Sequence, residues 1–168
     1  MNPPSIRVAG PDDLPALHAL IESAYRGDSA RAGWTHESDL LSEDRTSLEE
    51  LAAIVGDPDK RILVAERDGA VVGCVEVARE GEGVGYFGML TVDPRQQAAG
   101  LGKRLIAAAE REAAKTFGAT RMVLAVVDKR PELIAYYERR GYAATGEVRP
   151  FPAPEAIPLD LLIYSKPL

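Results

Sequence analysis

The segment from Leu90 to Leu105 has the clearest potential for chemistry. A predicted strand ends at Asp93-Pro94, small residues follow, and a predicted helix begins at Gly102. The first backbone N–H groups of a helix have no partners inside the helix and lie at the positive end of its dipole, so they bind anions. Gly100 and Gly102 carry no Cβ atoms that would obstruct a phosphate. The segment therefore predicts an anion site suited to phosphate.

Spacing separates three kinds of phosphate site. A Walker loop needs a glycine where this chain has Gln97, and a Ser or Thr where Arg104 follows Gly102-Lys103. A dinucleotide fingerprint needs Gly-x-Gly-x-x-Gly in the first βαβ unit, whereas this chain has Gly100-x-Gly102 in mid-chain. Both spacings argue against a nucleotide-dependent enzyme. The third kind of site is indicated by a family pattern.

Two motifs carry a family resemblance that extends over most of the chain. Gln97-x-x-Gly100-x-Gly102, placed after Leu90-x-Val92-x-Pro94, resembles the pyrophosphate loop of the GNAT family of acetyl-CoA-dependent N-acetyltransferases. Downstream, Arg130 to Tyr142 resembles the family signature Asn-x-x-Ala-x-x-x-Tyr-x-x-x-Gly-Phe. Tyr137, Gly141 and Tyr142 match it, whereas Arg130 replaces the Asn and Leu133 the Ala.

The resemblance implies how acetyl-CoA is held. Main-chain groups of the strand around Leu90 and Val92 would hold the pantetheine arm, and the amides from Gln97 to Lys103 would hold the pyrophosphate. Arg130 can offer a phosphate a charged donor in place of the family's Asn. The implied cofactor-binding residues are Leu90, Thr91, Val92, Gln97, Ala98, Ala99, Gly100, Leu101, Gly102, Lys103, Arg130 and Tyr137.

The implied reaction is direct attack of an amine on the thioester of acetyl-CoA in a ternary complex. It needs a neutral amine, a donor for the tetrahedral oxyanion and an acid for the departing thiolate. Tyr137 matches the family's thiolate-protonating tyrosine, the alternative being a purely structural core aromatic. A backbone amide near Leu90 or Thr91 would supply the oxyanion donor.

The general base has several candidates. Glu76 lies in a predicted strand, where alternation directs it either toward the substrate or into solvent. Tyr86 falls near the place where some family members carry a catalytic carboxylate, although a phenol is a weak base there. Asp128, Glu22 and His36 are further candidates, and a chain of water molecules without a single base is an open alternative.

The sequence predicts the residues that bind the acceptor less precisely than those that bind the cofactor. Trp34 lies in a polar segment, residues 27–45, predicted as a loop with at most one helical turn, where it either anchors the loop or lines an acceptor pocket. Arg26, Arg31 and Arg45 could recognise an acceptor carboxylate, with surface solvation as the default. The predicted substrate-binding residues are Glu22, Tyr25, Trp34, Tyr86 and Asp128.

Cysteine and histidine predict neither a disulfide nor a metal site. Cys74 is the only cysteine and lies between Gly73 and Val75 in a predicted strand, where a buried apolar role is the more common one. His18 and His36 have no nearby Cys or His partners with the spacing of metal ligands.

Periodicity supplies the elements that must position these residues. It predicts the order β-α-α-β-β-β-α-β-α-β-β, and hence an α/β (α+β) layered architecture with one mixed sheet. The resemblance implies a mostly antiparallel sheet, splayed between its fourth and fifth strands and flanked by about four helices. Strands are predicted over residues 6–9, 62–66, 71–77, 86–92, 121–127, 142–148 and 159–165, and helices over 14–25, 47–55, 102–116 and 132–139.

Length, charge and hydropathy limit the class of protein and the partners that the chain can have. With 168 residues and a net charge of −6, the chain predicts a single globular domain, residues 1–168, that phosphate backbones of nucleic acids repel. The negative charge favours cationic amines slightly, although solubility is the simpler explanation for it. No apolar run approaches the roughly 20 residues that span a bilayer, and the first residues lack signal-peptide features, so we expect a cytoplasmic protein without membrane partners. A homodimer is the commonest assembly by base rate and stays an open alternative to a monomer.

The sequence thus predicts a cytoplasmic acetyltransferase that moves the acetyl group of acetyl-CoA to a primary amine of a small-molecule or peptide acceptor. The alternative is a non-catalytic CoA-binding sensor or interaction module with the same loop. Loss of turnover with intact cofactor affinity on replacing Tyr137 by Phe would separate the two.

Overall fold

The computed structural model describes residues 3–25, 46–150 and 160–168, and every predicted strand and helix is present in it. The described residues also contain two 3-10 helices, η1 before α1 and η4 before α3. The elements are β1 (Ser5–Val8), η1 (Pro11–Asp13), α1 (Leu14–Tyr25), α2 (Leu48–Gly56), β2 (Lys60–Arg67), β3 (Ala70–Gly81), β4 (Val84–Val92), η4 (Pro94–Ala99), α3 (Leu101–Phe117), β5 (Arg121–Val127), α4 (Pro131–Arg139), β6 (Ala143–Pro150) and β7 (Asp160–Pro167).

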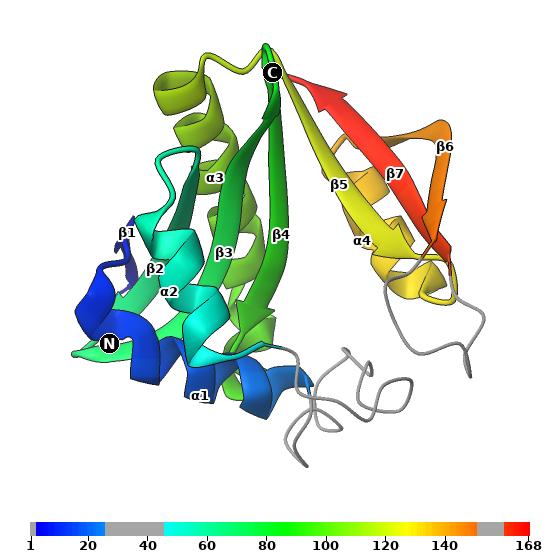
Figure 1. Cartoon of the computed structure of the whole chain (residues 1–168). Coiled ribbons are helices and arrows are strands. Elements are labelled where there is room, and N and C mark those ends of the chain that lie inside the picture. The colour runs from blue at the N-terminus through cyan, green and yellow to red at the C-terminus, as the bar shows by residue number, and fades with distance from the viewer. Residues whose placement is uncertain (1–2, 26–45, 151–159) are drawn as a thin grey trace.

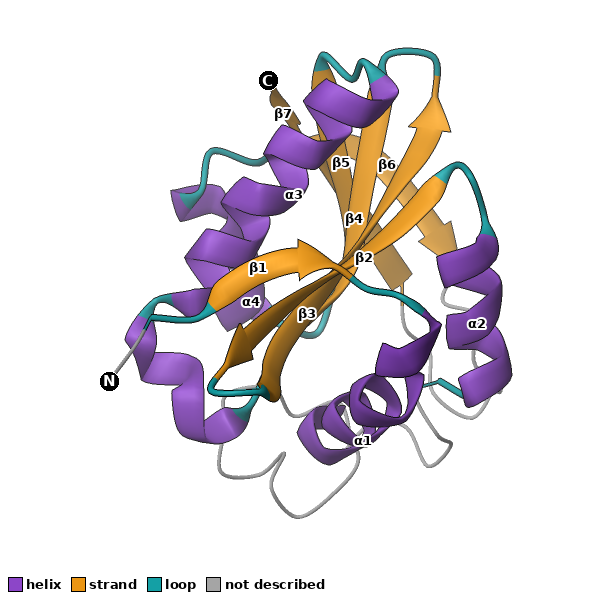
Figure 2. Cartoon of the chain, turned by 90° about the vertical axis from the view of Figure 1, so that its left-hand side faces the viewer, coloured by secondary structure: helices purple, strands orange, loops and turns teal. Residues whose placement is uncertain are grey.

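One seven-stranded sheet forms the centre of the molecule, in the order β1-β2-β3-β4-β5-β7-β6. All neighbouring strands are antiparallel except β4 and β5, which are parallel. Helices α1 and α2 cover one face, and α3 and α4 cover the other (Figures 1 and 2). The mixed, mostly antiparallel sheet that the sequence indicated is confirmed.

The sheet opens between β4 and β5. These two strands pair at only three positions, from Val84 with Arg121 to Tyr86 with Val123, and then diverge. On its other side β5 pairs with β7 along its whole length. Figure 1 shows the result as two limbs, β1–β4 and β5–β7, that meet at one end and separate toward the other. We call this opening the splay.

Apolar packing fixes α3 and α4 on their face of the sheet. Helix α3 directs a stripe of buried side chains at the sheet, among them Leu105, Ile106 and Ala109. They share one core cluster with Phe87 of β4 and Tyr137 of α4. Because burying each large apolar side chain stabilises a fold by roughly 1.5–3 kcal/mol, this core holds both helices firmly beside the splay.

A helix cap, a tight turn and apolar packing shape the face of the sheet that α1 and α2 cover. Ser47 caps α2 by accepting a hydrogen bond from the Glu50 amide at 3.1 Å. Asp68 and Gly69, with φ of 52° and 83°, form the hairpin turn between β2 and β3. A second core cluster, including Leu17 and Leu51, packs α1 and α2 against the sheet.

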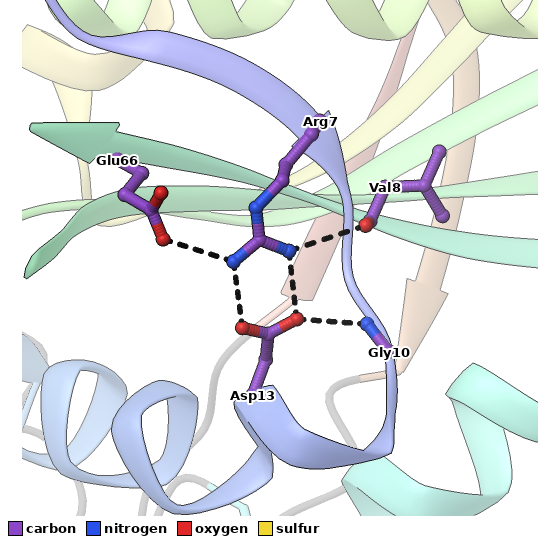
Figure 3. Close-up of polar contacts among 5 residues, drawn as sticks. All are labelled: Arg7, Val8, Gly10, Asp13 and Glu66. Atoms are coloured by element: carbon purple, nitrogen blue, oxygen red, sulfur yellow. Dashed lines mark hydrogen bonds and ion pairs between the residues drawn. The ribbon is translucent and has the colours of Figure 1, made fainter. Parts of the chain in front are cut away.

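A polar corner attaches α1 to the sheet. Arg7 of β1 donates to both carboxylate oxygens of Asp13, at 2.9 and 2.8 Å, and to Glu66 of β2 at 3.0 Å (Figure 3). Asp13 also accepts from the amide of Gly10 at 2.8 Å. Arg7 thereby holds the pKa of Asp13 at about 2, below its ordinary value of 3.8.

Candidate active site

The phosphate loop predicted from the sequence connects β4 to α3. It follows the end of β4 that has separated from β5. Asp93 begins the turn by accepting hydrogen bonds from the backbone and side chain of Arg95, at 3.0 Å from the amide. This contact lowers the pKa of Asp93. Residues 94–99 then form the 3-10 helix η4, and Gly100 begins α3 in the left-handed region at φ 75°. For Gln97, Ala98 and Ala99 the backbone is described and the side chains are not.

The beginning of α3 suits an anion. Gly100 occupies the N-cap position and has no side chain with which to cap the first-turn amides of Leu101, Gly102 and Lys103. A Cβ built on Gly100 would meet no atom of the described residues within 4 Å, so that part of the chain leaves the space beside Gly100 open. Open space in front of several convergent N–H donors matches the pyrophosphate of a coenzyme.

Gly102 is constrained by a different neighbour. A Cβ at this position would lie 2.8 Å from the hydroxyl oxygen of Tyr136 in α4. That distance is shorter than real Cβ atoms tolerate, so Gly102 allows a tyrosine of α4 to lie against the first turn of α3. The sequence indicated the glycine but not the tyrosine, because only the packing of α4 on α3 brings them together.

A β-bulge shapes β4 beside the splay. Cys74 pairs with Thr91 and Glu76 with Gly88, so β4 has one residue more than β3 between these pairs. Met89 has φ 55°, and the Thr91 hydroxyl donates to its carbonyl oxygen at 2.9 Å. The bulge reverses the side-chain alternation: Phe87 packs with the α3 core, Met89 with the α1–α2 core, and Leu90 again with the α3 core.

Tyr137 lies in an aromatic cluster at the splay. Its ring meets Phe87 of β4 edge-on with centroids 5.8 Å apart, and also contacts Tyr136 and Tyr142. Tyr137 is 8% exposed. Tyr137 therefore belongs to the core and stands beside β4, and its role as the acid for the thiolate stays a prediction.

Arg130 is buried at the start of α4. Its side chain is 4% exposed, and its Nε atom lies 2.8 Å from the Glu132 carboxylate. A phosphate would have to compete with Glu132 for this guanidinium. The predicted phosphate contact of Arg130 stays a prediction.

Glu76 and Tyr86 come together on the opposite face of the sheet from Tyr137. Glu76 of β3 pairs directly with Gly88 of β4. The hydroxyl of Tyr86 lies where a Cβ on Gly88 would be, so the tyrosine ring covers that glycine. Directly opposed residues have Cβ positions roughly 5 Å apart, which places the Tyr86 hydroxyl close to the stem of Glu76.

The other predicted acceptor residues are further apart. Glu22 of α1 accepts from the amide of Thr46 at 3.0 Å and so anchors the entry to α2. Asp128 accepts from the amide of Asp160 at 3.4 Å, at the end of β5. Only the backbone of Tyr25 is described. The remaining predicted residues lie outside the described part of the chain: Arg26, Arg31, Trp34, His36 and Arg45.

Neither a metal cluster nor a spanning helix is found in the described ranges. No group of three His, Cys, Asp or Glu side chains there has the arrangement of a metal site. Cys74 is buried, and its Sγ atom lies 3.9 Å from the carbonyl oxygen of Met89. None of the helices within these ranges is both long enough and apolar enough to cross a bilayer.

Comparison with known proteins agrees with this geometry. A model of the acetyltransferase (GNAT) family matches residues 16–142. The IAA acetyltransferase of Azospirillum brasilense is 32% identical over 169 residues, covering 98% of this chain and 99% of the relative.

Solved structures share the fold. The PaiA N-acetyltransferase of Thermoplasma acidophilum, in complex with coenzyme A, aligns with a TM-score of 0.76 at 19% identity, covering 100% of both chains. The YncA protein of Salmonella typhimurium, solved with acetyl-CoA, gives a TM-score of 0.73 at 20% identity, covering 99% of this chain and 95% of that one. Together with the family match, these findings show that the chain belongs to the GNAT family and is an acetyl-CoA-dependent acetyltransferase.

Proposed function

We propose that the chain, acting as one domain in the cytoplasm where acetyl-CoA is available, acetylates a primary amine of a small molecule or peptide. The observation that carries the proposal is the splay, because it gives the reaction two separate sides. Tyr137 and the α3 N-terminus lie on one face, and Glu76 and Tyr86 lie on the other.

On the first face the chain binds and orients the donor. The amides of Gly100 to Lys103 take the pyrophosphate, and the backbone of β4 around Leu90 to Val92 guides the pantetheine arm into the splay. Bound acetyl-CoA supplies an activated acyl group. The bulge at Met89 redirects the backbone of β4 at the point where an amide is needed for the oxyanion, so we assign that role to an N–H group near Leu90 or Thr91.

On the second face the chain receives the amine. A primary amine near pKa 10 is mostly protonated at pH 7 and must lose a proton before it attacks the carbonyl carbon. Glu76 is the residue we assign to accept that proton, directly or through water, with Tyr86 orienting the amine. As the new N–C bond forms and the C–S bond breaks, the Tyr137 hydroxyl would give its proton to sulfur. The proton that the attacking nitrogen must then lose to become an amide would pass through water and restore the phenol.

The relatives do not fix the acceptor. The relative from Azospirillum brasilense is named an IAA acetyltransferase, and its substrate is a property of that protein. The acceptor of this chain is therefore proposed only as an amine class.

The testing experiment has two stages. Calorimetric titration with acetyl-CoA should give micromolar binding, with ATP and NAD binding at least 100-fold more weakly. An amine library, followed by the release of free thiol, should then give at least one acceptor with turnover. Equal binding of ATP would contradict the cofactor placement, and tight acetyl-CoA binding without turnover on any amine would favour the non-catalytic module.

A further inference from the structure

The hairpin between β2 and β3 contacts the loop that leads into α3. Arg67, the last residue of β2, donates a hydrogen bond from Nη1 to the side-chain oxygen of Gln96 in η4. Both side chains are partly buried. A hydrogen bond from a charged donor is roughly twice as strong as one between neutral groups. The motif that identified the loop begins at Gln97, so it includes neither of these residues.

The fold directs Arg67 toward this loop. Arg67 precedes the tight turn at Asp68-Gly69 and pairs with Ala70 across the hairpin, which fixes its backbone. Successive residues of a strand point to opposite faces of the sheet. Glu66 contacts Arg7 in the polar corner beside α1, and Arg67 therefore extends toward the α3 face.

The contact falls in the middle of the loop. At the start of the loop, the Asp93 amide donates to the carbonyl oxygen of Val72 at 2.9 Å. The Gln96 amide donates to the carbonyl oxygen of Asp93 at 2.7 Å and closes the first turn of η4, and Gly100 then begins α3. The hydrogen bonds of a 3-10 helix have poorer geometry than those of an α-helix. A side chain that holds η4 from outside therefore helps to fix its conformation.

We propose that Arg67 is a positioning residue, which through Gln96 holds η4 in the conformation from which α3 begins. In this role Arg67 acts through the loop and not on the cofactor directly. The proposal rests on the acetyl-CoA-dependent function above. A loop that is already ordered loses less conformational freedom when a ligand binds. The contact should therefore raise the affinity for acetyl-CoA and leave the chemical step unchanged.

Hydrogen exchange of the free protein tests whether Arg67 orders the loop. Arg67→Met keeps a long side chain and removes the donor. We expect the amides of residues 95–100 to exchange at least 5-fold faster in this variant than in the parent, and those of α4 to exchange at the parent's rate. Arg61→Met is the matched control, because Arg61 lies near the other end of β2, is also partly buried and donates to backbone carbonyls. It should leave the exchange of the loop unchanged.

Affinity and turnover distinguish positioning from direct contact with the cofactor. Arg67→Met should raise the Kd for acetyl-CoA about 5-fold by calorimetry and leave kcat within 2-fold, whereas Arg61→Met should change the Kd less than 2-fold. Gln96→Met should give the same rise as Arg67→Met, and the double variant no further rise, because both substitutions remove one contact. Arg67→Lys, which retains a charged donor, should recover part of the affinity.

Thermal unfolding checks that each variant keeps its fold, and Gln96→Met removes the same contact from the loop if Arg67→Met does not fold. Unchanged exchange of residues 95–100 in Arg67→Met, or equal acceleration in Arg61→Met, would overturn the proposal. Losses of affinity that add in the double variant would also overturn it, because Arg67 would then act on the cofactor directly. Failure of the parent to bind acetyl-CoA would overturn the proposed function, and hydrogen exchange would still test the role of Arg67 in the loop.

Discussion

The two faces of the sheet are built in different ways at the splay. On the α3–α4 face, an apolar core holds both helices, and the site consists of backbone amides, glycines and buried tyrosines. On the α1–α2 face, the residues near the splay are partly exposed polar side chains, Glu76 and Tyr86, and the Arg7 corner helps to hold α1 in place.

The proposed function explains the difference by what each face would bind. Every enzyme of this type uses the same donor, and backbone amides recognise a pyrophosphate whatever the surrounding side chains are. An acceptor is recognised through its own polar groups, which needs particular side chains in particular places. Substitutions on the first face should therefore alter cofactor affinity, and substitutions on the second should alter turnover of the amine.

The largest effect should come from Gly100→Glu. The new carboxylate enters the open space before α3 and repels the pyrophosphate, so acetyl-CoA affinity should fall at least 100-fold, or about 2.7 kcal/mol. Gly118→Glu is the matched control, because Gly118 ends the same helix with φ 65° and also has open space around it. Both variants carry the cost of a non-glycine residue at positive φ, roughly 1 kcal/mol. If both bound acetyl-CoA like the parent, the anion site would not lie at α3.

Next in size is the loss of catalysis in Tyr137→Phe. Removing the acid for the thiolate should lower kcat about 100-fold and leave the Kd for acetyl-CoA within 3-fold, since general acid catalysis contributes roughly 100- to 10,000-fold. Tyr142→Phe is the control within the same aromatic cluster. It breaks the 2.8 Å hydrogen bond to Glu110 and should reduce thermal stability with little effect on kcat. An unchanged kcat in Tyr137→Phe would leave the residue a structural aromatic.

The part of this comparison that the sequence predicts is the cofactor face. Gly100 and Gly102 are required by backbone conformation and close packing, and such requirements leave residue types that can be recognised without a structure. The bulge at Met89 was not predictable, because the left-handed residue is a methionine and the glycine stands one position earlier. The contact between Tyr136 and Gly102 was missed as well, because it depends on how α4 packs against α3.

The acceptor face was predicted only as a set of candidates. Alternation left two directions open for Glu76, and only the strand register placed it opposite Gly88 and next to Tyr86. The sequence could not show that the carboxylates of Glu22 and Asp128 accept hydrogen bonds from backbone amides.

A smaller effect is expected for Glu76→Gln. Without the base, kcat/KM for the amine at pH 7 should fall about 10-fold while acetyl-CoA affinity stays unchanged. The loss should shrink as the pH approaches the pKa of the amine, near 10, because the amine then becomes neutral without help. Glu80→Gln removes the same charge from the same strand and should change kcat/KM less than 2-fold. A uniform loss at every pH would show that Glu76 positions the acceptor and does not accept its proton.

The smallest effect should come from the polar corner that supports the acceptor face. Arg7 holds the pKa of Asp13 at about 2, against 3.8 for the ordinary group, so the ionised carboxylate stabilises the fold above about pH 4 and this contribution disappears as the pH falls toward 2. Because Arg7 is 43% exposed, we expect Asp13→Asn to reduce the free energy of unfolding by only about 1 kcal/mol at pH 7.

Urea unfolding at pH 7, 4 and 3 would measure this contribution, with Asp12→Asn as an exposed control in the same 3-10 helix. The difference in the free energy of unfolding between Asp13→Asn and the parent should become smaller at pH 3. The free energy of unfolding of Asp12→Asn should equal that of the parent at every pH. If Asp13→Asn also left amine turnover and acetyl-CoA affinity unchanged, the corner would support the face without taking part in the reaction. A loss of turnover with intact cofactor affinity would instead show that the position of α1 helps to set the acceptor site, and would extend that site beyond Glu76 and Tyr86.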